Sequence, residues 1–319
     1  METSSRYLTD QQAADYGAFC NQRITHTQFQ NTYAKVANFH LAGKFAYVPG
    51  IMTLVGETGA GKSSVVDDYC RDANAKYERH AVVSIVVRES SSVKDLAAGM
   101  LRALGDPLCG KGTKESMERR IAEYANYNDV EMFIFDEFQH LTNRGQSARS
   151  FDAADWLKTQ VEVLRRPFLF VGLPEVDNIF SLNAQLETRR KERVQLAPFN
   201  TDTADGTKEA AMFFYMLNQG LPLPNQKASA LLDLDYVGRV VSRCGGLVGY
   251  MTKVVQYAVK TALLDEADTL RWEHIEGALD DLGGVTFEVG LGAVRPEVQK
   301  KKTRKGKTRQ VEEANNGVF

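Results

Sequence analysis

Residues 56–63 (GETGAGKS) match the phosphate-binding pattern GxxxxGK[ST] in full. Glycines there let backbone N–H groups close around phosphate oxygens, and the start of a following helix adds a positive field. Lys62 would neutralise charge on the β- and γ-phosphates, and the Ser63 hydroxyl would bind Mg²⁺. The predicted nucleotide-binding residues are Gly56, Glu57, Thr58, Gly59, Ala60, Gly61, Lys62, Ser63 and Ser64.

An acidic pair supplies independent evidence for the same chemistry, since a short Gly-rich pattern by itself also occurs in ordinary turns. Asp136 and Glu137 follow four apolar residues in MFIFDE, and the carboxyl ends of strands hold ligands in open α/β sheets. We expect Asp136 to hold Mg²⁺ together with Ser63. Glu137 would act as general base toward the water that attacks the γ-phosphate. No NKxD motif of the GTPases follows a strand, which favours ATP.

The elements that position these residues alternate along the chain between residues 49 and 200. Apolar β-rich runs alternate there with amphipathic stretches, the pattern of a parallel sheet flanked by helices. The sequence therefore predicts an α/β fold: a three-layer P-loop NTPase core of the AAA+ type with a parallel five-stranded sheet. The expected strands are 51–56, 80–88, 131–136, 167–172 and 194–198, and the expected helices are 62–77, 93–104, 114–127 and 151–165.

Three further segments surround this core. Residues 201–285 read as a small helical lid, with helices at 207–219, 227–243, 247–264 and 272–282. Residues 1–48 are predicted to be a mainly helical extension that packs on the core, and residues 286–319 a flexible basic tail. The apolar residues expected to anchor the extension are Phe19, Phe29, Tyr33, Val36, Phe39 and Leu41.

Composition and charge narrow the class of protein. The 319 residues are 43% hydrophobic and 25% charged, typical of a soluble protein. No apolar run has the length of a membrane helix and the N-terminus lacks a signal-peptide pattern, so a cytoplasmic protein with no membrane contact is expected. The four cysteines are scattered, which suggests neither disulfides nor a zinc site.

The net charge of −2 conceals an asymmetry. Residues 300–309 carry seven basic side chains, and without them the chain has 32 basic against 41 acidic residues. An acidic body has no global field that attracts nucleic acid, so DNA contacts must come from local clusters or from the tail. The tail is either a solvated terminus or a binding element for DNA or an acidic partner.

In AAA+ rings an arginine from one subunit commonly lies beside the γ-phosphate of the next, where it stabilises charge in the transition state. Arg189, in QLETRRKERVQL ahead of the last strand, is the first candidate. Arg190 and Arg193 are alternates, and a plain surface charge run with Glu187 and Glu192 is the other interpretation.

The usual sensing residues are not evident in the sequence. The fourth strand ends in VGLPE, where only Glu175 is a weak polar candidate. In GGLVGYM the lid would bring Gly249 to the nucleotide, but Tyr250 stands where many AAA+ proteins carry arginine. Hydrolysis is therefore expected to be slow.

The P-loop, IFDEFQHL, QLETRR and GGLVGYM, in this order, resemble the TniB/TnsC family of AAA+ transposition regulators, which is related to the B protein of phage Mu. The resemblance runs from about residue 25 to 285. Its most specific part is DEFQHL, although Phe138, His140 and Leu141 are also explained by packing at a turn between strand and helix.

The resemblance implies an ATP-dependent protein that forms rings or helical filaments on double-stranded DNA and recruits a transposase to a site marked by a target-selection protein. Contacts in the family are to the DNA backbone and carry little sequence information. The alternative for the matching residues is an ordinary solvated loop. The matching residues here are Lys94, Lys111, Thr113 and Lys114, with Arg88 a weaker candidate.

Two other functions remain open from the sequence. One is a replication initiator or helicase loader with the same core, although the stretch after the lid is too short for a winged-helix domain. The other is a nucleotide-gated scaffold in which binding rather than turnover carries the function. ATP turnover with and without duplex DNA would separate that scaffold from an ATPase.

Overall fold

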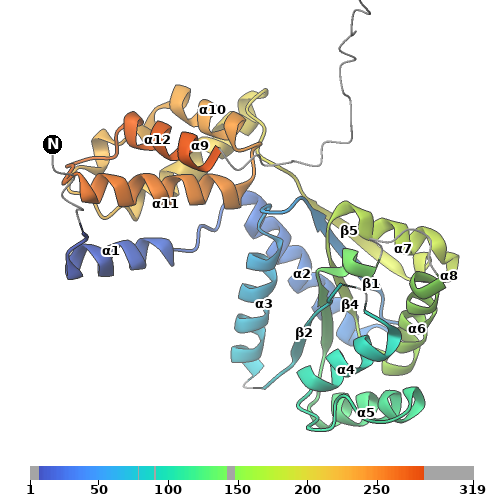
Figure 1. Cartoon of the computed structure of the whole chain (residues 1–319). Coiled ribbons are helices and arrows are strands. Elements are labelled where there is room, and N and C mark those ends of the chain that lie inside the picture. The colour runs from blue at the N-terminus through green and yellow to red at the C-terminus, as the bar shows by residue number, and fades with distance from the viewer. Residues whose placement is uncertain (1–6, 78, 90, 142–147, 284–319) are drawn as a thin grey trace, which may run out of the picture. The chain divides into compact units, whose positions relative to one another are not determined.

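The computed structural model describes residues 7–77, 79–89, 91–141 and 148–283 (Figure 1). The predicted basic tail lies outside these ranges. The first half consists of α1 (Asp10–Cys20), α2 (Thr27–Phe45), β1 (Ile51–Gly56), α3 (Lys62–Tyr77), β2 (Val82–Val86), α4 (Val93–Ala103), α5 (Lys114–Tyr127), β3 (Met132–Asp136) and the 3-10 turn η1 (Phe138–Leu141). The second half consists of α6 (Ala148–Leu164), β4 (Phe168–Gly172), η2 (Pro174–Val176), α7 (Asp177–Leu182), α8 (Ala184–Glu187), β5 (Arg190–Leu196), α9 (Ala204–Gln219), η3 (Gln226–Ala228), η4 (Ala230–Leu232), α10 (Leu234–Arg243), α11 (Val248–Leu264) and α12 (Trp272–Gly283).

The five strands form one parallel sheet in the order β2-β3-β4-β1-β5. The predicted fold class is confirmed. The largest error in a strand boundary concerns β5, which begins at Arg190, four residues before the expected start at Val194, while β2 is two residues shorter at each end than the expected 80–88. Strand β5 lies at an edge of the sheet, and exposed or half-buried polar residues fill its first half. An apolar run therefore marks only its last residues.

Alternate residues of the strands bury two separate apolar layers. Met52 and Leu54 of β1 pack with residues of α2 and α3, whereas Ile51 and Val55 pack with residues of α4, α5 and α6. Figure 1 shows α2 and α3 on one side of the sheet and the α4–α8 helices on the other. Because both faces are covered, the central strands are continuous apolar runs, and this is why the sequence revealed them.

The helices after β5 share a third apolar cluster, built around Phe213, Phe214, Val255 and Val259. The expected single helix over 227–243 was wrong, since the chain makes two 3-10 turns before α10. The Asp233 side chain accepts hydrogen bonds from the N–H groups of Asp235, at 2.9 Å, and Tyr236, at 3.3 Å. This N-cap starts α10 late in the segment.

The N-terminal helices divide between two clusters. Phe19 of α1 joins the cluster of the C-terminal helices, while Phe29, Val36 and Phe39 of α2 join the layer under the sheet. Leu41 was wrongly expected to be buried, because 55% of its surface is exposed.

Three observations concern cysteines, metals and membranes. All four cysteines are free thiols. Within the described ranges, no helix is long and apolar enough to cross a membrane. The same ranges contain no group of side chains arranged to hold a metal by themselves.

Candidate functional site

The loop of residues 57–61 joins the end of β1 to the start of α3, and glycine determines its shape. Gly59 and Gly61 have φ angles of +83° and +95°, which glycine adopts without steric cost. A side chain at Gly56 would lie 2.6 Å from the Leu196 carbonyl oxygen. The Ala60 N–H closes the turn by donating to the Glu57 carbonyl at 3.1 Å. The loop is therefore a backbone cradle of the kind that phosphates require.

Lys62 turns its ammonium back onto this loop. Its Nζ donates to the carbonyl oxygens of Gly56 at 2.7 Å and Glu57 at 3.0 Å. Burial lowers the pKa of Lys62, although Asp136 and Glu137 raise it in part. An ammonium held by carbonyls alone can exchange them for phosphate oxygens, which are stronger partners because they are charged.

Ser63 and the acidic pair meet at the end of β3. The Ser63 Oγ donates to Asp136 Oδ2 at 3.0 Å, and the Glu137 N–H donates to Asp136 Oδ1 at 2.8 Å. Burial raises the pKa of Asp136, and both hydrogen bonds oppose that rise. A hydroxyl next to a carboxylate offers the hard oxygen ligands that Mg²⁺ takes beside phosphates.

Glu137 has an unusual backbone. Its φ is +56°, a left-handed conformation that costs a residue with a side chain about 1–3 kcal/mol. The surrounding hydrogen bonds maintain it, because its N–H donates to Asp136 and its carbonyl accepts from the His140 N–H at 3.1 Å. Such strain is common at functional sites. The half-buried side chain of Glu137 lines the same cavity as Lys62 and Ser63.

Gln139 is the neighbour of Glu137 that the sequence interpretation missed. Its Nε2 donates to Glu137 Oε2 at 2.5 Å, and its Oε1 accepts from the Leu173 N–H at 3.2 Å. The side chain is buried and packs on Gly172, where a Cβ would lie 2.3 Å from Gln139 Oε1. One amide thus joins the acidic pair to the end of β4. The one indication in the sequence was that a polar residue, able to contact the carboxylate, stands two positions after Glu137.

The other residues of DEFQHL pack at the turn after β3, which was the alternative explanation for their presence. Phe138 is fully buried and stacks on Phe170 with ring centroids 4.2 Å apart, and Leu141 is buried in the same layer. His140 lies half-buried with Nε2 3.9 Å from Glu137 Oε2.

The phosphate loop, Glu137 and Gln139 line one cavity of about 430 Å³. Six predicted nucleotide-binding residues line it together with Glu137 and Gly249, whereas Gly56 and Ala60 are buried beneath the loop. The six are Thr58, Gly59, Gly61, Lys62, Ser63 and Ser64.

Six further residues, none of which the sequence assigned to the nucleotide, also line this cavity. Arg23, His26 and Phe29 come from the junction of α1 and α2, and Thr252, Lys253 and Gln256 come from α11. Only the folded chain brings these segments beside the phosphate loop, so no local pattern marks the first set. Lys253 could have been predicted from the sequence, because it follows Gly249 by one helical turn and therefore lies on the same face of the helix.

The start of α11 touches the phosphate loop directly. The Gly249 N–H donates to the Gly59 carbonyl at 2.8 Å. A side chain at Gly249 would lie 3.1 Å from that oxygen, so only glycine fits without displacement. Tyr250 lies against Gly59, and Lys253 Nζ stands 5.9 Å from the centre of the Tyr250 ring. Lys253 therefore supplies a cation near the position where arginine was missing. Glu175 is exposed on η2 and does not line the cavity.

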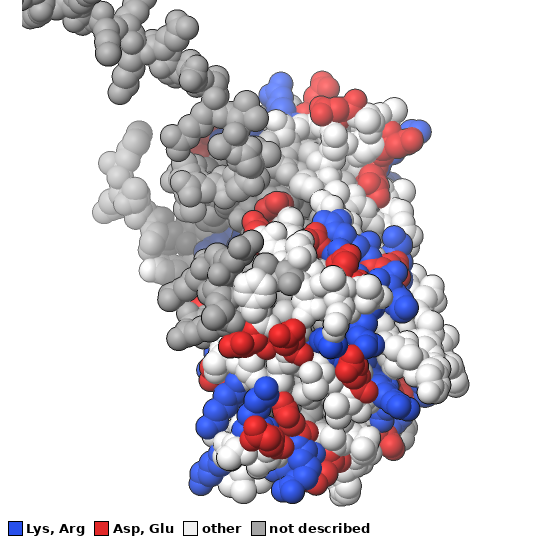
Figure 2. All heavy atoms as spheres, turned by 90° about the vertical axis from the view of Figure 1, so that its right-hand side faces the viewer, with Lys and Arg blue, Asp and Glu red and all other residues white. Residues whose placement is uncertain are grey.

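Of the three candidate arginines, only Arg189 lies ahead of the last strand, where all three were expected. Arg190 and Arg193 are inside β5, and Arg189 directly precedes it. Arg189 pairs with Glu162 of α6, while Arg190 and Arg193 both pair with Asp177. Figure 2 shows basic and acidic side chains interleaved across the face to which α6 and α8 belong. These pairs fit the charge-run interpretation, which also included Glu187, a partner of Arg190.

The candidate DNA contacts lie in the first turns of α4 and α5 and in the segments that precede these helices. Arg88, Lys94, Lys111 and Lys114 are exposed. Thr113 has a structural role as the N-cap of α5, where its Oγ1 accepts from the Ser116 N–H at 3.3 Å.

Arg120 fixes the loop that carries Lys111. Its guanidinium pairs with the buried Asp106 and donates to the carbonyls of Leu108, at 3.2 Å, and Lys111, at 2.5 Å. The basic loop between α4 and α5 is therefore held in one shape rather than only solvated.

The comparisons with known proteins agree with this architecture. The model of the family described as Bacterial TniB protein matches residues 21–201, more than half of the chain. A search of curated proteins found no match. The matched residues include the N-terminal segment at the cavity as well as the whole sheet.

Solved structures share the fold at low identity. The Aeropyrum pernix ORC2 protein, in ADPNP-ADP complexes, matches with a TM-score of 0.58 and 15% identity over 82% of this chain and 68% of that one. The Aeropyrum pernix ORC1 protein in complex with DNA gives 0.58 and 15%, over 79% and 65%. Drosophila ORC bound to DNA gives 0.56 and 14%, over 88% and 67%. This chain therefore has the fold of the AAA+ ATPases.

Proposed function

Because the chain belongs to the TniB family of AAA+ ATPases associated with transposition, we propose that it is an ATP-dependent transposition regulator that assembles on double-stranded DNA. ATP would switch the assembly, and hydrolysis would release it. The assembled protein would recruit a transposase to a site marked by a target-selection protein.

One observation carries this proposal: the phosphate loop, Ser63 and Glu137 line one cavity at the carboxyl end of the sheet, and Asp136 contacts Ser63 at its edge. Lys62 Nζ donates to loop carbonyls, and phosphate oxygens would replace these carbonyls as its partners. Ser63 and Asp136 already lie in contact at 3.0 Å. The residues thus fit MgATP, which would supply the γ-phosphoryl group and a divalent charge on its oxygens.

The chain's own groups account for the hydrolytic step. The loop N–H groups and Lys62 would bind the β- and γ-phosphates and stabilise the charge that develops on them. Glu137 would orient a water and accept its proton. Gln139 would position the Glu137 carboxylate through the bond from Nε2, while its Oε1 stays on the Leu173 N–H. In this way Gln139 takes the place of the polar residue absent from the end of β4.

The cavity also contains the parts of a nucleotide switch. The α11 helix touches the loop through Gly249, and Lys253 lines the same cavity. A bound γ-phosphate would attract Lys253 and so favour one position of the C-terminal helices, residues 201–285, acting as a lid. Arg189, with Arg190 and Arg193 as alternates, would complete the site of a neighbouring subunit.

DNA would be bound through its backbone by Lys94, Lys111 and Lys114, with Thr113 and Arg88 nearby. The loop geometry imposed by Arg120 supports this assignment. Side chains of this kind on phosphates give affinity without sequence preference.

ATP turnover with and without duplex DNA tests the proposal. Wild-type protein should hydrolyse ATP faster with DNA, and Glu137→Gln should reduce turnover by about 100-fold or more while it still binds ATP, since general bases contribute at least this much. Equal, negligible turnover in both proteins would instead favour a nucleotide-gated scaffold. Glu175→Gln, at an exposed carboxylate outside the cavity, is the matched control.

A further inference from the structure

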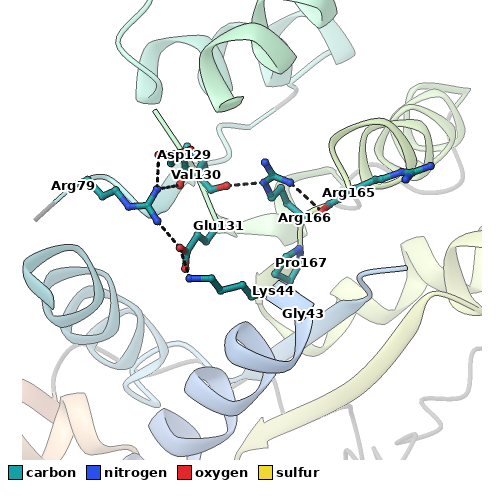
Figure 3. Close-up of a pocket in the computed structure, with 9 residues that line it drawn as sticks. All are labelled: Gly43, Lys44, Arg79, Asp129, Val130, Glu131, Arg165, Arg166 and Pro167. Atoms are coloured by element: carbon teal, nitrogen blue, oxygen red, sulfur yellow. Dashed lines mark hydrogen bonds and ion pairs between the residues drawn. The ribbon is translucent and has the colours of Figure 1, made fainter. Parts of the chain in front are cut away.

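A second pocket, of about 320 Å³, lies at the opposite end of the sheet (Figure 3). Its walls come from the end of α2 and from the residues that precede β2, β3 and β4. The nucleotide cavity has no residue in common with it. The lining residues are Gly43, Lys44, Arg79, Asp129, Val130, Glu131, Arg165, Arg166 and Pro167.

One buried carboxylate orients two cations at this pocket. Glu131 Oε1 accepts from Lys44 Nζ at 2.7 Å and from Arg79 Nη2 at 2.5 Å. Arg79 also donates to the Asp129 carbonyl at 2.6 Å. Figure 3 shows Lys44 and Arg79 converging on Glu131 from different elements. Because both cations are already fixed, little conformational entropy is lost when they meet a ligand.

The remaining cations carry uncompensated charge. Arg166 donates to the Val130 carbonyl at 2.7 Å and to Asn126 Oδ1 at 3.3 Å, which are neutral acceptors. Within the described ranges neither Arg165 nor Arg166 pairs with a carboxylate. The pocket thus has four cationic side chains against the two carboxylates of Asp129 and Glu131.

Exposed apolar side chains border the same cations. Phe45 is 79% exposed and Tyr47 87%, and the guanidinium of Arg165 lies 5.9 Å from the Tyr47 ring centre. Val48 and Val163 are half or more exposed. Large exposed apolar groups that cluster in this way mark protein interfaces. We name Lys44, Phe45, Tyr47, Val48 and Arg165 the basic aromatic face.

This face is continuous with the candidate trans arginine. Arg189 pairs with Glu162, which directly precedes Val163, and a side chain at Gly50 would lie 3.1 Å from the Arg189 carbonyl oxygen. A neighbour that received Arg189 would therefore lie next to the face as well.

The chain also carries a surface of complementary chemistry. Residues 232–235, Leu-Asp-Leu-Asp, are all exposed, with Leu232 at 40% and Leu234 at 58%. The stretch alternates apolar and acidic side chains, which complement the charge and the apolar character of the basic aromatic face. The basic residues 300–309 have the wrong charge for this role.

We propose that the basic aromatic face of one copy binds residues 232–235 of the next copy. Two different surfaces then meet in a head-to-tail contact, which generates rings or filaments. This inference rests on the proposed function in one respect, namely that the chain assembles with ATP and DNA. It adds the surfaces that make the contact.

A charge exchange tests the contact, with sedimentation of the full chain on duplex DNA and an ATP analogue as readout. Arg165→Glu and Asp235→Arg should each weaken assembly about tenfold, because each places like charges together. The double variant should assemble as wild type does, since every junction then has an opposite pair again. Lys208→Glu, at an exposed lysine of α9, is the matched control.

The outcomes separate this inference from the proposed function. If wild-type protein does not assemble, the proposed function fails. If wild type assembles and both single variants do so equally well, the contact is wrong. Loss of assembly in the single variants without recovery in the double variant would exclude the pairing of these two surfaces. Thermal unfolding of each variant shows that the change is not a folding defect.

Discussion

At the scale of single residues, the site depends on how Glu137 is held. Its left-handed backbone and the contacts of Asp136 and Gln139 determine where its carboxylate lies. The sequence marked Asp136 and Glu137 because acidic residues after an apolar strand are a local pattern. It did not mark Gln139, since the role of that amide depends on the N–H of Leu173, 34 positions away.

Gln139→Leu should separate binding from catalysis. Leucine keeps the volume but removes both amide contacts, so kcat should fall about 10- to 100-fold through misplacement of the general base. KM and the affinity for an ATP analogue should change less than about twofold. The measurement is steady-state turnover together with analogue binding.

Gln160→Leu is the control for this change, because Gln160 is a buried glutamine of α6 that does not line the nucleotide cavity. Gln139→Leu also leaves the Leu173 N–H without its acceptor, so thermal unfolding of both variants is measured beside turnover. A loss of kcat of the same size in Gln160→Leu would show a general packing effect and contradict the positioning role.

At the scale of elements, the strands that are buried along their length were the ones that the sequence predicted well. Strands β1, β3 and β4 are buried along their whole length and were visible as apolar runs. The edge strand β5 and the capped start of α10 were misplaced, because polar residues do not distinguish an edge strand or a turn from a loop. The approach of the junction between α1 and α2 to the phosphate loop was not predictable, because it depends on long-range packing.

His26 at that junction should make stability depend on pH. It is buried among Phe29, Phe199 and Phe213, and burial lowers its pKa to about 4. Between pH 6.5 and 4 the unfolded chain binds a proton that the folded chain excludes, so the free energy of unfolding falls as the pH falls. From pH 7 to 5 this amounts to about 2 kcal/mol.

Denaturant unfolding at both pH values measures this effect. His26→Phe should lose about 2 kcal/mol less than wild type between pH 7 and 5, because phenylalanine binds no proton. The exposed His80→Gln serves as control and should lose as much as wild type. An equal loss in the His26→Phe variant would mean that His26 titrates normally in the folded chain.

The loop between α4 and α5 is an element whose role can be tested through salt. If Lys111 and Lys114 each neutralise one phosphate, their double substitution by alanine should lower the slope of log K against log salt by about 2. Affinity should fall to the same extent for unrelated duplex sequences. Binding is measured by fluorescence anisotropy at several salt concentrations, with Lys208→Ala as control. An unchanged slope would show that these lysines do not contact DNA.

At the scale of the whole molecule, the direction of β5 bears on how subunits cooperate. Arg190 pairs with Ile51 at the start of β1, whereas Leu196 lies beside Gly56 at the phosphate loop. Six residues of strand separate these ends, roughly 20 Å. Arg189 and Arg190 are therefore too far from the nucleotide site of their own chain, and a role of either one in hydrolysis requires a neighbouring subunit. Arg193 pairs with Thr53 in the middle of the strand and lies about half as far from the loop.

Mixing two inactive proteins tests that role. Arg189→Ala keeps Glu137 but lacks the arginine, whereas Glu137→Gln keeps Arg189 but lacks the general base. In an equal mixture half of the sites keep Glu137, and half of these face an intact arginine, so turnover should recover to about a quarter of the wild-type rate if the arginine acts across the interface. The ion pair lost with Arg189 is partly exposed, and such pairs near the surface contribute only about 0–1 kcal/mol, so both proteins should remain folded.

The same mixing with Arg190→Ala and Arg193→Ala identifies which arginine acts. Only the variant of the trans residue should be inactive alone and recover with Glu137→Gln. The other arginines would keep their pairs inside one chain, Arg189 with Glu162 and Arg190 and Arg193 with Asp177. Retained turnover in all three arginine variants would show that these residues form a surface charge run. Inactive variants that do not recover in the mixture would place the defect within one subunit. This outcome would contradict a role across the interface, which the roughly 20 Å between the start of β5 and the nucleotide site of the same chain requires.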